Sequence, residues 1–138
     1  MNRKRIRLIS GQDFSLTGVN FDRPNLVGAP IISHANKAAL IRGYFNTAAF
    51  AANQPGQYGT AGRNLFSGPG LFNTNLSLVK SFKISERLGA LQFRAEFFNL
   101  FNNVNLGQPD ANFVSRTFGQ IQTAGDPRIL QFALRYQF

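Results

Sequence analysis

The sequence predicts an all-β protein, an antiparallel meander of about four strands that forms part of a transmembrane β-barrel with long outer loops. Three observations predict this fold class: a strictly alternating stretch at residues 131–138, a pair of alternating stretches within residues 72–97, and long segments rich in Gly, Pro and Asn between them. Strict alternation gives a strand one apolar and one polar face. Helix signals are poor, because no long segment repeats apolar residues at spacings of three and four with caps.

The end of the chain carries the clearest strand pattern. Polar or small residues alternate there with four apolar ones, Phe132, Leu134, Tyr136 and Phe138. Soluble domains usually fray at their ends. Strands of outer-membrane barrels, in contrast, face lipid on one side and carry aromatic residues at the membrane interface. We therefore expect a barrel strand from about Arg128 to Phe138.

Two further strands are predicted on either side of a short link at residues 84–89. Their apolar positions are Phe72, Leu76, Leu78 and Phe82 in the first strand, and Leu91, Phe93, Ala95 and Phe97 in the second. Lys80 shares the apolar parity of the first strand and Val79 breaks its polar parity. Each strand has about the 9 to 11 residues that cross a bilayer at a tilt.

The alternation assigns side chains to the two sides of a barrel wall. The residues expected to face lipid are Leu76, Leu78, Phe82, Leu91, Phe93, Phe97, Phe132, Leu134 and Tyr136. The residues expected to face a water-filled lumen are Asn75, Ser77, Gln92, Arg94, Glu96 and Arg135. Two consecutive bulky residues, Phe97 and Phe98, predict a position in an aromatic girdle or a β-bulge.

The remaining segments are punctuated by turn-forming residues. Residues 31–71 and 102–127 are rich in Gly, Pro and Asn, and we expect them to be long outer loops. Loops of this length are uncommon inside a compact domain but normal on the outer side of a membrane barrel. Short strands are expected at residues 14–17 and 118–122.

The N-terminal end differs from the rest of the chain. Four of its basic residues form a cluster, within a formal net charge of +9: Arg3, Lys4, Arg5 and Arg7. Residues 1–10 are therefore expected to be a disordered basic end or a miscalled start, and residues 11–138 the C-terminal portion of a barrel. The apolar part of this end is too short for a signal peptide, so we expect the chain as given to lack one. No stretch approaches the roughly 18 apolar residues of a membrane helix.

The basic balance also supports an alternative, a soluble basic β-protein that binds nucleic acid or an acidic partner. A base-stacking sheet needs its aromatic and basic side chains on one face. Residues 91–101 place them on opposite faces, so we expect no nucleic acid partner. Salt-dependent retention on DNA, with deletion of residues 1–10 as the control, discriminates between the two interpretations.

Residues suited to catalysis or metal binding are few. The chain has no Cys, and its single His, His34, lies in a loop-like stretch, so we expect a surface role for it. Glu86 lies in a turn and Glu96 partway along the next strand, so they do not form a catalytic pair. The Gly-rich residues 59–63 and 68–70 lack the Gly-Lys-Ser/Thr ending that holds phosphates. We expect no enzyme activity, no cofactor and no metal.

Several stretches together resemble the C-terminal part of TonB-dependent outer-membrane receptors, and among these the Oar-like receptors common in Acidobacteria. The stretches run from Leu16 to Gly28, Tyr44 to Phe50, Gly62 to Gly70, Phe93 to Asn102, and Gly125 to Arg128 followed by Gln131 to Phe138. The resemblance covers roughly residues 11–138. The combination is specific, although no single motif is.

The resemblance implies a barrel of about 22 strands with an N-terminal plug, which imports a solute with energy passed from the inner membrane. The chain would be a fragment of it in the bacterial outer membrane, contributing the closing strands but no complete transport activity alone. Implied partners are outer-membrane lipid, the barrel-assembly machinery and, through the missing parts of the receptor, the TonB system. The implied assembly signal consists of Gln131, Ala133, Tyr136 and Phe138, with Ala133 where Gly is usual.

Overall fold

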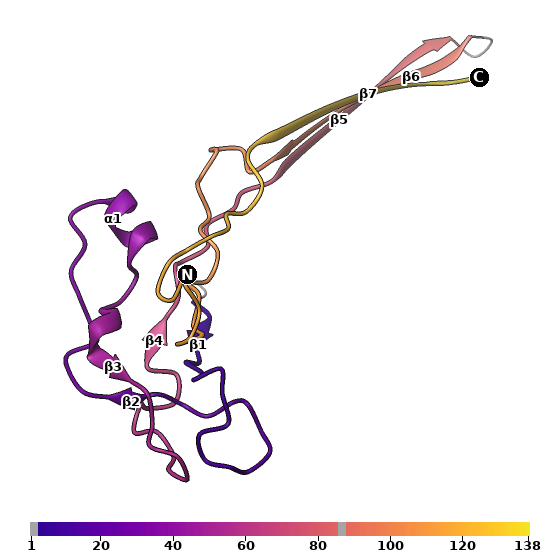
Figure 1. Cartoon of the computed structure of the whole chain (residues 1–138). Helices are drawn as coiled ribbons and strands as arrows, with labels where there is room; N and C mark the ends of the chain where they lie inside the picture. Colours follow the sequence, from indigo (N-terminus) through magenta and orange to yellow (C-terminus); the bar gives the residue numbers. More distant parts are fainter. Residues whose placement is uncertain (1–2, 86–87) are drawn as a thin grey trace. The chain divides into compact units, whose positions relative to one another are not determined.

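A computed structural model describes residues 3–85 and 88–138 and divides the chain into two compact units (Figure 1). Unit 1 comprises Met1–Gly70 and Leu106–Ala124, and unit 2 comprises Leu71–Asn105 and Gly125–Phe138. Unit 1 is thus completed by a segment inserted in the connection between the last two long strands. No helix among the described residues is long and apolar enough to cross a membrane.

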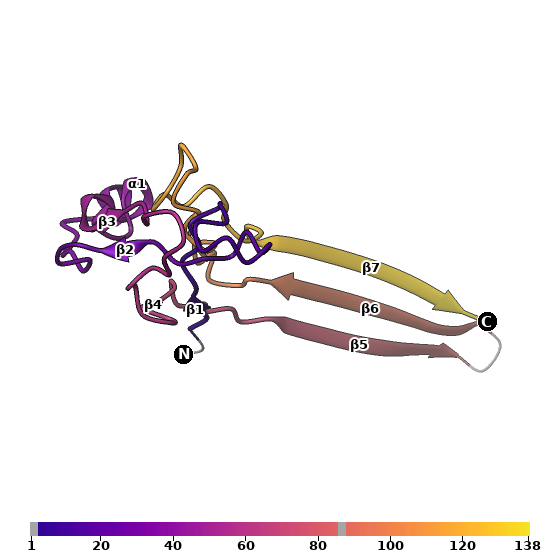
Figure 2. The same ribbon diagram turned by 60° about the horizontal axis from the view of Figure 1, so that its bottom comes forward.

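Unit 2 contains three long antiparallel strands, β5 (Leu76–Ser85), β6 (Gly89–Phe98) and β7 (Ile129–Gln137). They follow one another across the sheet in chain order (Figure 2). The all-β antiparallel meander is therefore confirmed, with three long strands in place of about four. Among the described residues, β5 and β7 each pair with β6 alone, so this sheet is open at both edges. The first strand begins at Leu76, four residues later than its alternation starts.

The pairing register explains why this sheet forms. Leu78 lies opposite Ala95, which in turn lies opposite Phe132, so apolar side chains meet across all three strands. A slip of one residue in any strand would send its apolar side chains to the polar face. The register continues without a break to Phe98 and Ile129, so of the two alternatives at Phe97 and Phe98 the bulge is absent and the girdle position stays a prediction. An irregularity lies instead between Lys83 and Ser85, beside the turn into β6.

Glycine is required where this turn ends. Gly89 has φ +78°, a left-handed conformation that L side chains rarely adopt. A Cβ atom at this position would also lie 1.9 Å from the carbonyl oxygen of Gln137 on β7. The Ser85 Oγ atom accepts a hydrogen bond from the Leu88 N–H at 3.0 Å. The backbone at Gly89 thus lies close to the end of β7, and a side chain there would not fit.

Asparagine side chains organise the opposite end of the sheet. The side chain of Asn99 is buried and donates to the carbonyl oxygens of Asn103 (3.0 Å) and Asp126 (3.1 Å). Asn99 and Asn102 have φ near +50°, where Asn is more tolerant than other non-glycine residues. The Oδ1 atom of Asn102 accepts the Arg128 N–H at 3.1 Å, just before β7. Hydrogen bonds from asparagine side chains to backbone groups thus hold the chain that follows β6.

Unit 1 contains only short elements. Its two-stranded sheets pair β1 (Arg5–Ile6) with β4 (Phe66–Ser67) and β2 (Asn25–Leu26) with β3 (Phe50–Ala51). It also contains the helix α1 (Lys37–Arg42), capped by Asn36, and the 3₁₀ helix η1 (Thr47–Ala49).

The two short strands expected in unit 1 are not formed. Residues 14–17 make turns and bends, because the Asp13 carboxylate accepts the N–H groups of Thr17 and Gly18 at 3.0 and 2.6 Å and curls the chain. Residues 118–122 contain a single bridge, from Ile121 to Pro109.

Phenylalanine side chains form the core of unit 1, so the segments expected to be outer loops pack together. The Phe45 ring stacks on the Phe66 ring at 4.7 Å and meets the Phe50 and Phe118 rings edge-on. Residues 31–71 and 102–127 both contribute to this core. These Pro- and Gly-rich segments thus have little regular secondary structure but still pack into a buried core.

The N-terminal end differs from one of its two expected forms, the disordered basic end, while a miscalled start stays a prediction. Ile6 and Leu8 are buried in the same core, and the Ile9 N–H donates to the Ala111 carbonyl at 3.0 Å. Residues 3–10 are therefore ordered, because alternate apolar side chains point inward and arginine side chains point outward. Residues 1–2 lie outside the described part of the chain.

Candidate membrane-facing sheet

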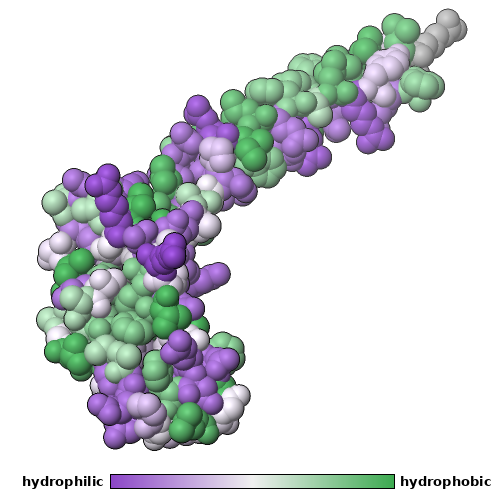
Figure 3. All heavy atoms as spheres, viewed as in Figure 1, coloured by the Kyte–Doolittle hydropathy of each residue, from purple (hydrophilic) through white to green (hydrophobic). Residues whose placement is uncertain are grey.

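The three long strands present one apolar face. Directly opposed residues lie on the same side of a sheet. The register gives four cross-strand rows on this face: Leu76–Phe97–Leu130, Leu78–Ala95–Phe132, Lys80–Phe93–Leu134 and Phe82–Leu91–Tyr136. All nine residues predicted to face lipid lie in these rows. Figure 3 shows green, apolar spheres gathered along one side of the sheet and purple, polar spheres along another.

Most of this apolar face is uncovered in the isolated chain. Phe132 is 60% exposed and Leu134 67% exposed, and every residue of β5 and β7 is exposed. A contiguous exposed apolar surface of this kind marks a membrane or protein interaction site. The sheet therefore offers a face that water does not favour.

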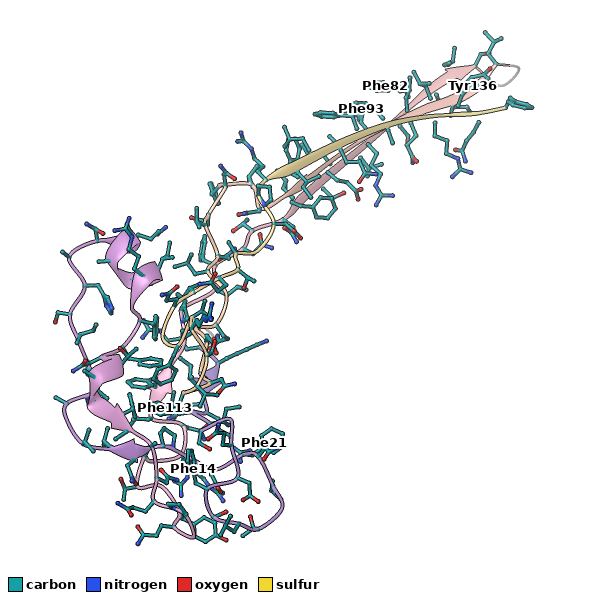
Figure 4. All side chains as sticks on the ribbon, in the orientation of Figure 1. Phe14, Phe21, Phe82, Phe93, Phe113 and Tyr136 are labelled. Carbon is teal, nitrogen blue, oxygen red and sulfur yellow. The ribbon has the colours of Figure 1, made fainter. Side chains whose placement is uncertain are left out.

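Three phenylalanine rings form a cluster on this face. Phe132 lies opposite Ala95, and its ring stacks near Phe93 at 6.3 Å and meets Phe97 edge-on at 6.2 Å. Phe93 can be followed in Figure 4, on the long sheet. Ala95 beneath them is only 3% exposed. A small residue at this position leaves room for the flanking rings, and such pairs stabilise a sheet beyond their buried area.

Lys80 interrupts the apolar rows. It lies between Leu78 and Phe82 on the same face, opposite Phe93. Its Nζ atom is 5.8 Å from the centroid of the Phe82 ring, within the range of a cation–π contact. The apolar stem of a lysine can cover neighbouring apolar surface while its charge reaches toward a more polar level. Lys80 is the single charged residue in the four rows.

The opposite face is polar along most of its length. Its rows are Ser77–Glu96–Gln131, Val79–Arg94–Ala133, Ser81–Gln92–Arg135 and Lys83–Ala90–Gln137. Five of the six residues predicted to face a lumen lie here. The sixth, Asn75, precedes β5, and its Oδ1 atom accepts the Asn99 N–H at 3.1 Å.

An ion pair lies on this polar face. The Arg94 Nε and Nη2 atoms donate to Glu96 Oε1 at 3.0 and 2.5 Å, from positions two residues apart on β6. The Gln92 Nε2 atom donates to Ser81 Oγ across the strands at 3.3 Å. The polar side chains therefore satisfy one another in part, while the arginine remains accessible to water.

The residues predicted to form an assembly signal lie along β7 and just after it, and those within the strand are divided between the two faces of the sheet. Of the four residues predicted to form an assembly signal, Gln131 and Ala133 lie on the polar face and Tyr136 on the apolar face. The Tyr136 hydroxyl donates to the Leu88 carbonyl in the turn before β6. Phe138 follows β7 and is fully exposed, with its ring 5.8 Å from that of Tyr136. The two aromatic rings thus lie at the end of the sheet that carries the short turn.

The family comparison agrees with this geometry. A family model described as outer membrane beta barrel domain matches residues 5–131. The chain belongs to the outer membrane beta barrel domain family. This membership makes it an outer-membrane β-barrel protein. No curated protein and no solved structure matches the chain significantly.

The family match covers unit 1 of this barrel domain almost completely. It begins at Arg5, within the N-terminal residues that the sequence analysis set apart from the barrel. Residues 31–71 and 102–127 also fall inside it. The segments that form the irregular core of unit 1 therefore lie within the matched residues.

The described residues of the barrel domain contain no group of three or more His, Cys, Asp or Glu side chains that could hold a metal ion. The His34 Nε2 atom donates to the Gly43 carbonyl at 2.7 Å, and its ring lies 6.2 Å from that of Tyr44. Glu86 lies outside the described residues, so its relation to Glu96 is not described. The asparagines around Asn99 were missed by sequence reasoning, although their frequency after β6 is a usable signal.

Proposed function

We propose that this barrel domain is the C-terminal segment of a TonB-dependent outer-membrane receptor of the Oar-like type. It supplies the closing strands of the barrel and the signal for its assembly. The apolar rows of the sheet face lipid, and the polar rows face the lumen. The segment has no complete transport activity alone and no catalytic role.

The observation that carries the proposal is the register of the sheet. It brings eleven apolar residues and one lysine onto one face of three consecutive strands. The strands contain 10, 10 and 9 residues. Lengths of about 9 to 11 residues suit a tilted crossing of the bilayer, and alternation of lipid-facing and lumen-facing residues is the pattern of outer-membrane barrels.

The connections support one orientation of the segment in the membrane. Outer-membrane barrels have short turns on the periplasmic side and long loops outside. The short turn between β5 and β6 lies beside the end of β7, because Tyr136 bonds to Leu88. The chain between β6 and β7 is much longer and contributes Leu106–Ala124 to unit 1. We therefore place Phe138 on the periplasmic side and the end of the sheet that carries the long connection between β6 and β7 on the outer side.

The proposed partners follow from the same surfaces. Outer-membrane lipid contacts the apolar rows, and the barrel-assembly machinery binds the end of β7. The TonB system acts only through other parts of the receptor. The resemblance of Gln131, Tyr136 and Phe138 to the terminal signal of the receptor family supports this assignment.

Single cysteine probes test the assignment of the two faces. The chain contains no Cys, so Leu134→Cys and Arg135→Cys each create one labelling site, on opposite faces of β7. The full chain carries an environment-sensitive fluorophore at one site and is inserted into lipid vesicles. We expect a quencher attached to the lipid acyl chain to act on the label at position 134, and a water-soluble quencher to act on the label at position 135. If the water-soluble quencher acts equally on both labels in vesicles, the assignment of the apolar face to lipid is overturned.

A second experiment tests the assembly signal. Phe138→Ala should slow insertion of the full chain into vesicles that contain the barrel-assembly machinery, by roughly tenfold if the aromatic is a main contact. Phe101→Ala is the matched control, because Phe101 is exposed in unit 2 but lies outside the strands. Equal rates for the two variants would remove the role of Phe138 in assembly.

A further inference from the structure

A polar cavity lies within unit 1. Its volume is about 260 Å³, slightly below the usual range of ligand pockets. Its lining includes three arginines, one aspartate and two aromatic residues: Arg7, Arg23, Arg63, Asp22, Phe21 and Tyr58. Phe21 can be seen at the margin of the unit in Figure 4. The combination joins positive charge to flat apolar surface.

The charges of this cavity are unbalanced. The Asp22 carboxylate is buried, and its two oxygens accept the N–H and the hydroxyl of Ser15 at 2.7 and 2.9 Å. Arg7 and Arg63 are exposed and make no hydrogen bond or ion pair with any other described residue. Three guanidinium groups against one carboxylate leave a net charge of about +2, which a dianion would balance.

The floor of the cavity is held in place before any ligand binds. The Arg23 Nη1 atom donates to the Ala61 carbonyl at 2.6 Å, and the Ala61 N–H donates to the Pro24 carbonyl at 3.1 Å. A Cβ atom on Gly59 would lie 1.8 Å from the Arg23 carbonyl oxygen, so glycine allows this close approach. Asn53 Nδ2 donates to the same oxygen at 2.8 Å. The chain around Arg23 is therefore fixed already, and this part of the site loses little conformational entropy on binding.

The aromatic side chains supply the second part of the site. Phe21 and Tyr58 line the cavity while remaining 58% and 69% exposed. Large exposed rings beside arginines provide faces on which a flat ring can stack. Neither ring belongs to the phenylalanine core of unit 1. Their exposed faces are therefore available to contact a ligand.

We propose that this cavity binds an aromatic phosphate monoester or an equivalent ring-bearing dianion. Arg7 and Arg63 form charge-assisted hydrogen bonds to the phosphate oxygens, for which the planar guanidinium is well suited. Arg23 adds positive charge from its fixed position. Phe21 and Tyr58 contact the ring. The site is independent of the sheet and of the receptor assignment proposed above.

Binding of simple probes to the full chain in detergent micelles tests the proposal by calorimetry. Phenyl phosphate combines a ring with two charges, inorganic phosphate lacks the ring, and benzyl alcohol lacks the charge. We expect phenyl phosphate to bind more tightly than inorganic phosphate, and benzyl alcohol not to bind measurably. Arg63→Ala and Arg7→Ala should each weaken phenyl phosphate binding by roughly tenfold or more. Tyr58→Ala should weaken phenyl phosphate binding but leave phosphate binding unchanged.

Arg116→Ala is the matched control, because Arg116 is exposed in unit 1 but does not line the cavity. It removes the same charge and should leave binding within about twofold. Circular dichroism checks that each variant keeps the wild-type fold. An equal loss in Arg116→Ala and Arg63→Ala would overturn the site in favour of general attraction to a basic chain. Absence of phenyl phosphate binding, or equal binding of benzyl alcohol, would overturn it outright.

Discussion

Units 1 and 2 bury their apolar residues in different ways. In unit 1 the Phe45 side chain is only 2% exposed, and Ile6, Leu8, Phe50 and Phe66 are buried around it. In unit 2 the strands are longer and more regular, yet Ala95 is the one buried apolar residue among those described. The described long strands thus lie in unit 2, whereas most of the buried apolar core lies in unit 1.

The difference indicates which solvent each unit needs. Unit 1 removes its large aromatic side chains from water by packing them on one another, which is the usual driving force for folding. Unit 2 pairs its three strands but leaves most of one apolar face exposed. In lipid, such a sheet needs no further core, because the acyl chains cover its apolar face. The unit that has the less regular structure is therefore the one suited to water.

The largest expected effect is the dependence of the whole chain on detergent. We expect the isolated chain to sediment from aqueous buffer and to remain dispersed, with strand-type circular dichroism, in detergent micelles. The physical reason is the exposed apolar face together with the two unpaired edges of the sheet, which favour association between chains. Analytical ultracentrifugation provides the measurement. Recovery of a detergent-free monomer that unfolds cooperatively would remove the contrast between the units.

A pair of phenylalanine substitutions sharpens the contrast. Phe45→Ala should destabilise unit 1 by about 3 to 5 kcal/mol, because it empties the centre of a packed aromatic core. Phe132→Ala should cost the sheet about 1 kcal/mol in micelles, mainly through lost contacts with Phe93 and Phe97. Both substitutions are made in a Tyr136→Phe background, so that tyrosine fluorescence reports on Tyr44 and Tyr58 of unit 1. Denaturant titrations in detergent, followed by this fluorescence and by far-UV circular dichroism of the sheet, separate the two effects. Similar losses in both variants would mean that the two units unfold together.

The sheet could be predicted from the sequence because its information is local. Phe132, Leu134 and Tyr136 alternate strictly, and period two assigns their common face without knowledge of the strand partner. The register then follows from the need to align apolar positions across strands. Lys80 and Val79, the two exceptions noted in the sequence, fall on the faces that the alternation gives them.

Unit 1 could not be predicted in the same way because its contacts are not local. Phe45, Phe66 and Phe118 meet in one core but are separated by irregular chain that carries no period. Glycine and proline correctly indicated turns, but turns do not exclude packing. The cavity arginines share this limitation, since Arg7, Arg23 and Arg63 come from three separate segments.

A glycine comparison tests how strongly the turn before β6 depends on the end of β7. Gly89→Ala should destabilise the sheet by about 2 to 4 kcal/mol, because it combines a positive φ with a contact to the Gln137 carbonyl. Gly18→Ala, in unit 1, shares a positive φ of +82° but has open space around the added carbon. It should therefore cost its own unit only about 1 to 2 kcal/mol. Thermal unfolding in micelles provides both values, and equal costs would show that the contact with β7 is unimportant.

The smallest expected effect is the response of unit 1 to acid. Burial alone would raise the pKa of Asp110, but hydrogen bonds from Ser115, Thr117 and the Asn112 N–H lower it below its ordinary value of 3.8. Hydrogen bonds from the Thr17 and Gly18 N–H groups likewise outweigh desolvation and lower the pKa of Asp13. A lowered folded-state pKa contributes stability above the unfolded value, and this contribution is lost as the pH falls through the folded value.

We therefore expect the stability of unit 1 to be constant near neutral pH and to fall once the pH drops below about 4. The double variant Asp13→Asn/Asp110→Asn should be less stable at neutral pH and should lose much of this acid dependence. In a Tyr136→Phe background, tyrosine fluorescence during denaturant titration at several pH values in a non-ionic detergent measures unit 1, and far-UV circular dichroism monitors the sheet. If the double variant keeps the full acid dependence, other carboxylates control it. If the sheet unfolds over the same pH range, the units are coupled, because neither aspartate belongs to unit 2.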